Sequence, residues 1–305
     1  MVAVFRIRLW LIVAASCWMS APADAQIVCR DTPEGRVCTA QQAIIAGTLV
    51  PVETQQELGL VTVGSGCSGT LVNRFWGLTA DHCVTTSGTI NGPVAPFSSM
   101  PITAAWSPRT VIPTRVVRNW GGAGVDIALV FLGAGDFGAA RIQLFFVDPL
   151  ETGMRVAKYG RGRDRLASAG PPPVQGAPSD GRYRSATFTV GTASGTAYTL
   201  PTDATSGQSA SAGDSGGPDF VIAPNNVLLG ISGVQSTCGW NAVAGMPTPP
   251  ATWNWVSSIP SCTSAAIADA RFDIVQIIQE GRNPCPDTSA ACGVLETTAL
   301  TLMLR

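Results

Sequence analysis

The sequence predicts a mainly β protein, and three observations carry that prediction. The 305 residues include 33 glycines and 22 prolines, which divide a chain into short elements joined by turns. Short apolar or alternating runs recur between turn residues at hairpin spacing, while long helical patterns are few. Hydrophobic residues make up 46% of the chain and charged residues 13%, which indicates a large core and a sparsely charged surface. The length allows one large domain or two small ones.

Residues 1–25 are typical of a secretory signal peptide. Two arginines precede the apolar run 9–19, and Ala-Asp-Ala at 23–25 offers a cleavage site between small residues. A membrane anchor is one alternative, but the apolar run is about half of the ~20 residues that a span needs. Lipidation at Cys17 is a second alternative. We expect an exported chain, periplasmic or secreted, that begins at Gln26 and keeps no membrane span.

The cysteine count is consistent with export. The chain has nine cysteines, and removal of Cys17 with the signal leaves an even number. An even number in an exported chain indicates disulfides formed in an oxidising compartment. Because many pairings are possible in principle, proximity along the chain is the guide for most of them. It suggests the pairs Cys29–Cys38, Cys238–Cys262 and Cys285–Cys292.

The first half of the mature chain combines a short arm with several predicted strands. Residues 26–43 are polar and cysteine-bearing, and we interpret them as a pro-segment or an N-terminal arm. Strands are predicted at 58–63, 69–72 and 76–79, each an apolar or alternating run bounded by turn residues. This half extends to about Leu132.

The second half follows a connector at 167–181 that is rich in proline, glycine and serine. Further strands are predicted at 184–190 and 226–231. One helix is predicted at 265–281, where apolar residues form a broad face and a glycine ends the pattern. The tail, 283–305, has no predicted structure or role.

Three residues with complementary chemistry stand in separate motifs. His82, the only histidine, lies in Thr-Ala-Asp-His-Cys, Asp126 precedes an apolar run, and Ser215 lies in Gly-Asp-Ser-Gly-Gly-Pro. A serine hydroxyl becomes an effective nucleophile when a neighbouring base takes its proton, and His82 is the only imidazole available for that role. The order His, Asp, Ser is one of three chain orders known for such a triad.

These motifs and their order resemble those of the chymotrypsin-like (trypsin-fold) serine proteases over about residues 44–280. The spacing agrees, with 44 residues from His82 to Asp126 and 89 from Asp126 to Ser215. The resemblance implies an all-β fold of two antiparallel six-stranded barrels with a C-terminal helix, in a domain at 44–282. It also implies a serine endopeptidase that works through an acyl-enzyme in the cleft between the barrels.

The resemblance assigns a role to each residue of the site. Ser215 would attack the scissile carbonyl, His82 would act as the base, and Asp126 would orient His82. The backbone N–H groups of Gly213 and Ser215 would form the oxyanion hole, for which glycine allows the tight geometry.

The resemblance also implies a disulfide between Cys67 and Cys83, which would hold the histidine loop in place. Closing a loop of this size is worth about 3 kcal/mol in the chain-entropy model. Many family members carry a further cysteine four residues before the serine, where this chain has Ser211. Cys238, which stands where the partner of that cysteine is found, must therefore pair elsewhere.

Activation in the family points to Asp214, which pairs with an N-terminal amine released by cleavage. The matching N-terminus here is Ile44, in Ile-Ile-Ala-Gly. The preceding Gln-Gln-Ala offers no arginine or lysine for a trypsin-like activator. Either another protease cuts after Ala43, or Asp214 uses a different cation.

The specificity pocket follows from the resemblance as well. Ser209, six residues before the nucleophile, would lie at its base beside Ala210, and a neutral residue there argues against cleavage after arginine or lysine. Small or medium apolar residues are favoured before the scissile bond. The pocket wall is expected from Gly233, Val234 and Gln235.

Composition and chemistry exclude several other functions. The formal net charge is −1 and the sequence pI is about 5.8, with no basic patch that would indicate nucleic-acid binding. No metal or cofactor is implied, and the expected partners are protein or peptide substrates and an activating protease. Two alternatives remain: a non-catalytic binding protein that keeps the fold, and an esterase or other acyl hydrolase that uses the same site.

Overall fold

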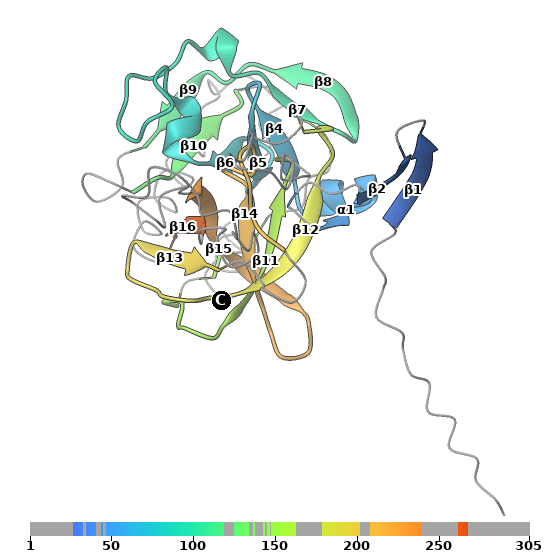
Figure 1. The fold of residues 1–305 in the computed structure, drawn as a ribbon. Helices are drawn as coiled ribbons and strands as arrows, with labels where there is room; N and C mark the ends of the chain where they lie inside the picture. The colour runs from blue at the N-terminus through green and yellow to red at the C-terminus, as the bar shows by residue number, and fades with distance from the viewer. Residues whose placement is uncertain are drawn as a thin grey trace, which may run out of the picture.

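The computed structural model describes residues 27–32, 35–40, 44, 47–118, 125–133, 137, 143, 145–146, 148–162, 179–201, 208–238 and 262–267. Within these ranges the chain forms two antiparallel sheets of seven strands each, and in Figure 1 the first sheet lies above the second. The expected two-barrel architecture is therefore confirmed, with seven strands in each sheet where six were expected.

The first sheet is built from consecutive strands of the first half of the chain. Its spatial order is β8-β7-β4-β5-β6-β10-β9. The strands are β4 (Leu60–Val63), β5 (Cys67–Leu71), β6 (Trp76–Thr79), β7 (Ile102–Ala104), β8 (Ser107–Val111), β9 (Arg115–Val117) and β10 (Ala128–Phe131). The three strands predicted from the sequence in this half correspond to β4, β5 and β6, so hairpin spacing located them correctly.

The second sheet has the order β13-β16-β15-β14-β11-β12-β3. Its strands are β3 (Thr48–Leu49), β11 (Arg155–Gly160), β12 (Arg184–Thr189), β13 (Ala197–Leu200), β14 (Pro218–Ile222), β15 (Leu228–Cys238) and β16 (Cys262–Ala266). The strand predicted at 184–190 is confirmed as β12. The strand predicted at 226–231 is confirmed in part, because β15 starts two residues later and is much longer. β3 precedes the first sheet along the chain but pairs with β12.

Helices contribute little within the described ranges. They are α1 (Val52–Glu57) and the short 3-10 helices η1 (Asp81–Val84) and η2 (Phe97–Ser99). None of these helices has the length and apolarity needed to cross a membrane. The helix predicted at 265–281 is wrong at its start, because Ala265 and Ala266 belong to strand β16. The rest of that prediction, and the tail after it, lie outside the described residues.

A two-stranded hairpin occupies the segment that we interpreted as a pro-segment or arm. It consists of β1 (Ile27–Thr32) and β2 (Gly35–Ala40). The register places Cys29 directly opposite Cys38, which fits the predicted pairing of these two cysteines. The connector at 167–181 falls largely outside the described residues.

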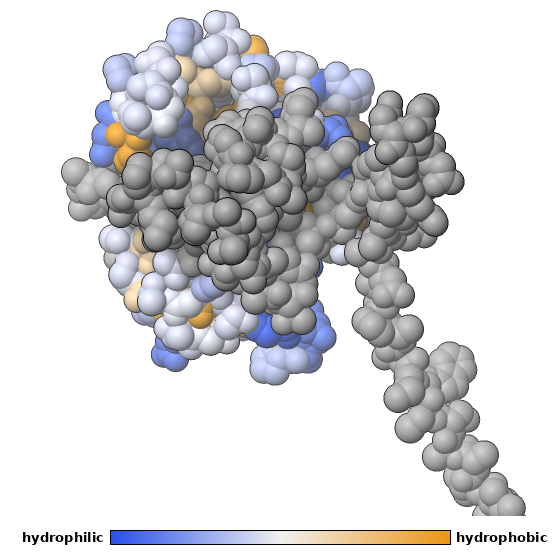
Figure 2. Space-filling model, in the orientation of Figure 1, coloured by the Kyte–Doolittle hydropathy of each residue, from blue (hydrophilic) through white to orange (hydrophobic). Residues whose placement is uncertain are grey.

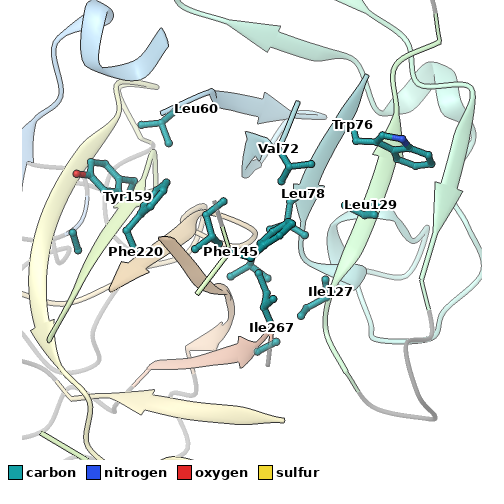
Figure 3. Close-up of a cluster of buried hydrophobic side chains, with 14 of the residues drawn as sticks. Leu60, Val72, Trp76, Leu78, Ile127, Leu129, Phe145, Tyr159, Phe220 and Ile267 are labelled. Atoms are coloured by element: carbon teal, nitrogen blue, oxygen red, sulfur yellow. The ribbon is translucent and has the colours of Figure 1, made fainter. Parts of the chain in front are cut away.

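The largest hydrophobic cluster lies between the two sheets and joins them (Figure 3). Leu60, Leu78 and Leu129 contribute from the first sheet, and Tyr159 and Phe220 from the second. Separate clusters fill each sheet's own interior. Large apolar side chains on the described surface are scattered, and Figure 2 shows only small orange areas among white and blue ones. The junction between the sheets is therefore packed, and it brings the loops of both halves together.

Candidate active site

His82 lies in η1, directly after β6, and a buried aspartate anchors this turn. The carboxylate of Asp81 is fully buried. It accepts a hydrogen bond from the backbone N–H of Asn91 at 2.6 Å and one from Arg118 Nη1 at 3.3 Å. These bonds fix the backbone that carries the imidazole, while the His82 side chain itself stays 16% exposed.

The Cys67–Cys83 disulfide ties the same turn to the start of β5. The two Cα atoms are 6.1 Å apart, within the range that disulfides span, so the pairing implied by the resemblance is confirmed. The two sulfurs and the His82 ring also form the one group of metal-type donors within the described residues. Because both sulfurs are consumed in the disulfide, this group does not fit a metal ion.

Asp126 lies next to His82 because β10, which follows it, pairs with β6, which precedes His82. The side chain is 2% exposed. Its Oδ1 accepts the backbone N–H of His82 at 2.9 Å, and its Oδ2 lies 2.7 Å from His82 Nδ1. This double contact fixes both the position and the orientation of the imidazole and leaves Nε2 free of Asp126.

Ser236, a residue that the sequence analysis missed, completes the surroundings of Asp126. Its hydroxyl donates to Asp126 Oδ2 at 2.5 Å. Burial alone would raise the pKa of Asp126, but the hydrogen bond from His82, the charge of His82 and the bond from Ser236 outweigh burial and lower it. Asp126 is therefore held as a carboxylate.

The loop that carries Ser215 is held against the histidine segment. The Ser215 carbonyl accepts the backbone N–H of Ser68 at 2.8 Å. A Cβ on Gly216 would lie 2.1 Å from Thr79 Oγ1 and 2.9 Å from the backbone nitrogen of Ala80, so the nucleophile loop touches the residues that lead into His82. The Ser215 hydroxyl has no hydrogen bond to any residue in the described part of the chain.

The backbone N–H groups of Gly213 and Ser215 donate to no acceptor among the described residues. Gly213 has φ +98°, a conformation that favours glycine. Its carbonyl accepts Ser68 Oγ at 2.9 Å, which holds the loop in this shape. The two residues predicted for the oxyanion hole therefore carry available donors.

Asp214 is fully buried beneath the same loop. Its Oδ1 accepts the backbone N–H of Gly162 at 2.7 Å, and its Oδ2 accepts the N–H and the hydroxyl of Ser211 at 2.7 and 3.2 Å. Burial raises the pKa of Asp214 to about 6, against the opposing effect of these bonds. Within the described ranges this carboxylate has no ion-pair partner.

Ile44, the other residue predicted for activation, lies in the interior of the second sheet. It is fully buried and packs in the cluster that contains Phe188, Tyr198 and Val221. Its backbone has φ +40°, which is strained for a β-branched residue. The structure therefore places both activation residues inside the second half of the molecule.

The residues predicted for the specificity pocket divide into two groups. Ser209 and Ala210 are 1% and 5% exposed, and Cys262 Sγ lies 3.4 Å from the Ala210 carbonyl oxygen. Gly233 is packed against the Tyr198 hydroxyl, where a Cβ would lie at 2.4 Å. Ala210 thus lies against the start of β16, while Gly233 is packed against Tyr198.

Val234 and Gln235 are also buried inside the sheet rather than exposed beside Ser215. Val234 belongs to the hydrophobic cluster between the sheets. The backbone of Gln235 holds the nucleophile loop. Its carbonyl accepts the N–H of Gly216 at 2.8 Å, and its N–H donates to the carbonyl of Gly217 at 2.9 Å. The part of β15 that faces Asp126 begins one residue further on, at Ser236.

Comparison with known families agrees with this geometry. The family described as Trypsin matches residues 44–256, well over half of the 305 residues. No curated protein matches the chain. The matched segment contains every residue of the candidate site except Cys262, and it covers strands of both sheets. The chain therefore belongs to the trypsin family of chymotrypsin-like serine proteases.

Proposed function

We propose that the protein is an exported serine endopeptidase that cleaves peptide bonds through an acyl-enzyme. The observation that carries this proposal is the double contact between His82 and Asp126, with the Ser215 loop packed against the segment leading into His82. An imidazole fixed through Nδ1 presents Nε2 to a nucleophile, as general-base catalysis requires. Membership of a serine protease family supports protein or peptide substrates.

In the proposed mechanism, Ser215 Oγ attacks the scissile carbonyl while His82 Nε2 takes the hydroxyl proton. Asp126 stabilises the imidazolium that forms, and its lowered pKa keeps it ionised for this role. His82 then gives the proton to the leaving amine, which frees the first product. Water, activated by His82, hydrolyses the acyl-enzyme and regenerates Ser215.

The oxyanion that develops on the carbonyl would accept the N–H groups of Gly213 and Ser215. A donor of this kind is worth roughly 2.7–4 kcal/mol in the transition state. Neither group has an acceptor among the described residues, which supports this role.

We also infer that cleavage after Ala43 activates the enzyme. A free amine on Ile44 would give the buried carboxylate of Asp214 a cation, which it does not have among the described residues, and cutting the bond would relieve the strain at Ile44. The alternative, a different cation, is disfavoured for Lys158 because its ammonium already binds Asp219 Oδ1 at 2.6 Å.

Export agrees with the Cys67–Cys83 disulfide, because such bonds persist in oxidising compartments. The signal peptide at 1–25 and the choice between periplasm and medium are part of the proposal. Neutral Ser209 supports a preference other than arginine or lysine before the scissile bond.

Labelling with a fluorophosphonate, followed by intact-mass analysis of the exported protein, tests the proposal. We expect one adduct that maps to Ser215, on a chain that starts at Ile44, and no adduct in the Ser215→Ala variant. A chain that starts at Ile44 but takes no label would contradict the proposal and favour a non-catalytic binding protein. A labelled chain that hydrolyses esters but not peptides would favour an acyl hydrolase.

A further inference from the structure

We propose that Lys158 and Asp219, a buried ion pair inside the second sheet, are positioning residues for the loop that carries Ser215. The pair does not touch substrate in this proposal. It holds the strand that follows the nucleophile in the register that the active site requires. The inference rests on the proposed protease function and deepens it, since it adds two residues that lie outside the triad and the oxyanion hole.

The pair is fully enclosed by protein. Both side chains are 0% exposed, and Lys158 Nζ lies 2.6 Å from Asp219 Oδ1. Burying two charges can cost more free energy than their attraction returns, and two well-packed apolar side chains are often at least as stable. Stability alone is therefore a weak reason for a buried pair at this place, and a role in fixing one arrangement of the strands is the better one.

Hydrogen bonds around the pair join five of the seven strands of the second sheet. Asp219, on β14, accepts the hydroxyl of Tyr198 from β13 at its Oδ2, at 2.8 Å. The backbone carbonyl of Asp219 accepts Ser232 Oγ from β15 at 3.2 Å. Lys158, on β11, also donates to Ser264 Oγ on β16 at 3.4 Å. A displacement of Asp219 would thus disturb contacts to each of the other four strands.

The pair lies at the end of the β11–β14 ladder that is next to Ser215. Lys158 is directly opposite Asp219 there, as the last pair of a regular register. On the other side of β14, the pairing with β15 shifts between Asp219 and Phe220, so the β15 side constrains the register less. A slip by one residue would turn Asp219 to the opposite face of the sheet, away from Lys158. The ion pair therefore selects the observed register.

The Ser215 loop depends on this register because β11 continues into a segment that packs closely against it. A Cβ on Gly217 would lie 2.1 Å from the Tyr159 carbonyl oxygen. A Cβ on Gly213, one of the two proposed oxyanion donors, would lie 2.8 Å from Gly162 Cα. Contacts this close leave no room for β14 to move along β11 while the loop keeps its shape.

The test replaces both charges at once, in Lys158→Met/Asp219→Leu, so that no charge is left buried alone. A pair that served stability only would leave turnover at the parental value. We expect a melting temperature close to that of the parent, with kcat at least about tenfold lower and KM within about twofold. A displacement of about 1 Å at a catalytic group can cost about 100-fold, and a loss in kcat with unchanged KM indicates an interaction made in the transition state.

Two further variants serve as matched comparisons. Lys158→Met/Asp219→Asn keeps an oxygen that can accept the Tyr198 hydroxyl, so it should recover part of the lost turnover. Arg155→Met removes a cation at the other, exposed end of β11, where Arg155 Nη1 donates to Asn226 Oδ1 at 3.0 Å, and should keep the parental kcat. Titration of reactive Ser215 with the fluorophosphonate gives the active concentration of each preparation.

A pH profile separates positioning from a second effect of Lys158. Its charge also lowers the pKa of Asp214 from a distance. A change in the titration of Asp214 alone would move the profile of kcat along the pH axis and leave its maximum unchanged. Misplacement of the Ser215 loop lowers the maximum itself, and this is the result that we expect.

The outcomes distinguish this inference from the proposed function. A double variant with leucine that is labelled at Ser215 and keeps the parental kcat overturns the positioning role and leaves the protease function standing. If that variant does not fold, Tyr198→Phe decides, because it removes a single hydroxyl from Asp219. Its kcat should fall several-fold at unchanged KM, and an unchanged kcat would overturn the role. A parent chain that starts at Ile44 and takes no label removes the proposed function instead.

Discussion

Two buried aspartates flank the Ser215 loop, and their surroundings act on them in opposite directions. Asp126 and Asp214 are 2% and 0% exposed, so burial penalises the charge of both. The pKa of Asp126 is nevertheless lowered, whereas that of Asp214 is raised to about 6. The difference lies in the partners, since Asp126 faces an imidazole, a hydroxyl and one backbone N–H, while Asp214 faces two backbone N–H groups and a hydroxyl.

This contrast teaches that neutral donors alone do not offset complete burial of a carboxylate. Gly162 and Ser211 donate three hydrogen bonds to Asp214, and Lys158 lowers its pKa only from a distance, because its ammonium binds Asp219. At Asp126 the charge and the ring bond of His82 reverse the effect of burial. Asp126 thus has a basic partner in His82, whereas Asp214 has no ion-pair partner among the described residues.

Removal of the Asp126 carboxylate should give the largest effect, a loss of turnover. Asp126→Asn leaves an amide where His82 needs a carboxylate, so the imidazole adopts the wrong tautomer and turnover should fall about 10⁴-fold. Steady-state kinetics on a peptide substrate, with melting temperature as a check on folding, measure this. Asp148→Asn, at an exposed position, is the matched control, and a loss below tenfold at position 126 would remove the assigned role.

Titration of Asp214 should give a smaller effect, a change in the stability of the protein that depends on cleavage after Ala43. Because the pKa of Asp214 in the folded protein, about 6, lies above the ordinary 3.8 of an aspartate, the uncut protein holds the proton in this interval while the unfolded chain releases it. Stability of the uncut protein should therefore fall as pH rises from about 4 to about 6 and then level off. Urea unfolding across this range measures the decline.

The same experiment on the cut protein sharpens the comparison. An amine on Ile44 that pairs with Asp214 would lower the carboxyl pKa, so the decline between pH 4 and 6 should shrink or vanish. Asp214→Asn, which cannot titrate, should remove this component from the uncut protein. Equal declines in the cut and uncut proteins would argue against pairing with the amine.

The smallest expected effect comes from removing one hydrogen bond to Asp126 while the carboxylate itself stays in place. Ser236→Ala removes one bond to the carboxylate, so the pKa of Asp126 should rise, and turnover should fall several-fold. Carboxyl-carbon NMR titration and kinetics measure the two changes. Ser232→Ala, a buried serine of the same strand that contacts Asp219 and Tyr198, should leave the pKa of Asp126 unchanged.

The sequence was informative where chemistry is carried by residue type in a short motif. His82, Asp126 and Ser215 could be selected because their motifs are local, and the strands β4, β5 and β6 because alternation and turn residues are local signals. The Cys67–Cys83 bond came from the family resemblance and is confirmed.

The sequence was uninformative where geometry depends on pairing between distant segments. Ser236 was missed because its contact with Asp126 depends on how β15 is paired. The register shift in that strand has no signature in the sequence. The helix prediction at 265–281 was wrong at its start because a short apolar run is compatible with helix or strand. Pairing with β15 and β13 makes Ala265 and Ala266 part of a strand.

The pairing of β3 with β12 has a consequence for the order in which the molecule assembles. The strands of the first sheet are contiguous in the chain, and its most widely separated partners are Trp76 and Phe131, whereas Thr48 pairs with Ser185, which lies much further along the chain. Contacts between distant segments form slowly because the loop between them must first be ordered. The half that carries His82 and Asp126 can thus form while the nucleophile is still unstructured. In the proposed protease, a half-site without its nucleophile could not cleave other chains, so self-digestion would be delayed until the whole molecule has folded.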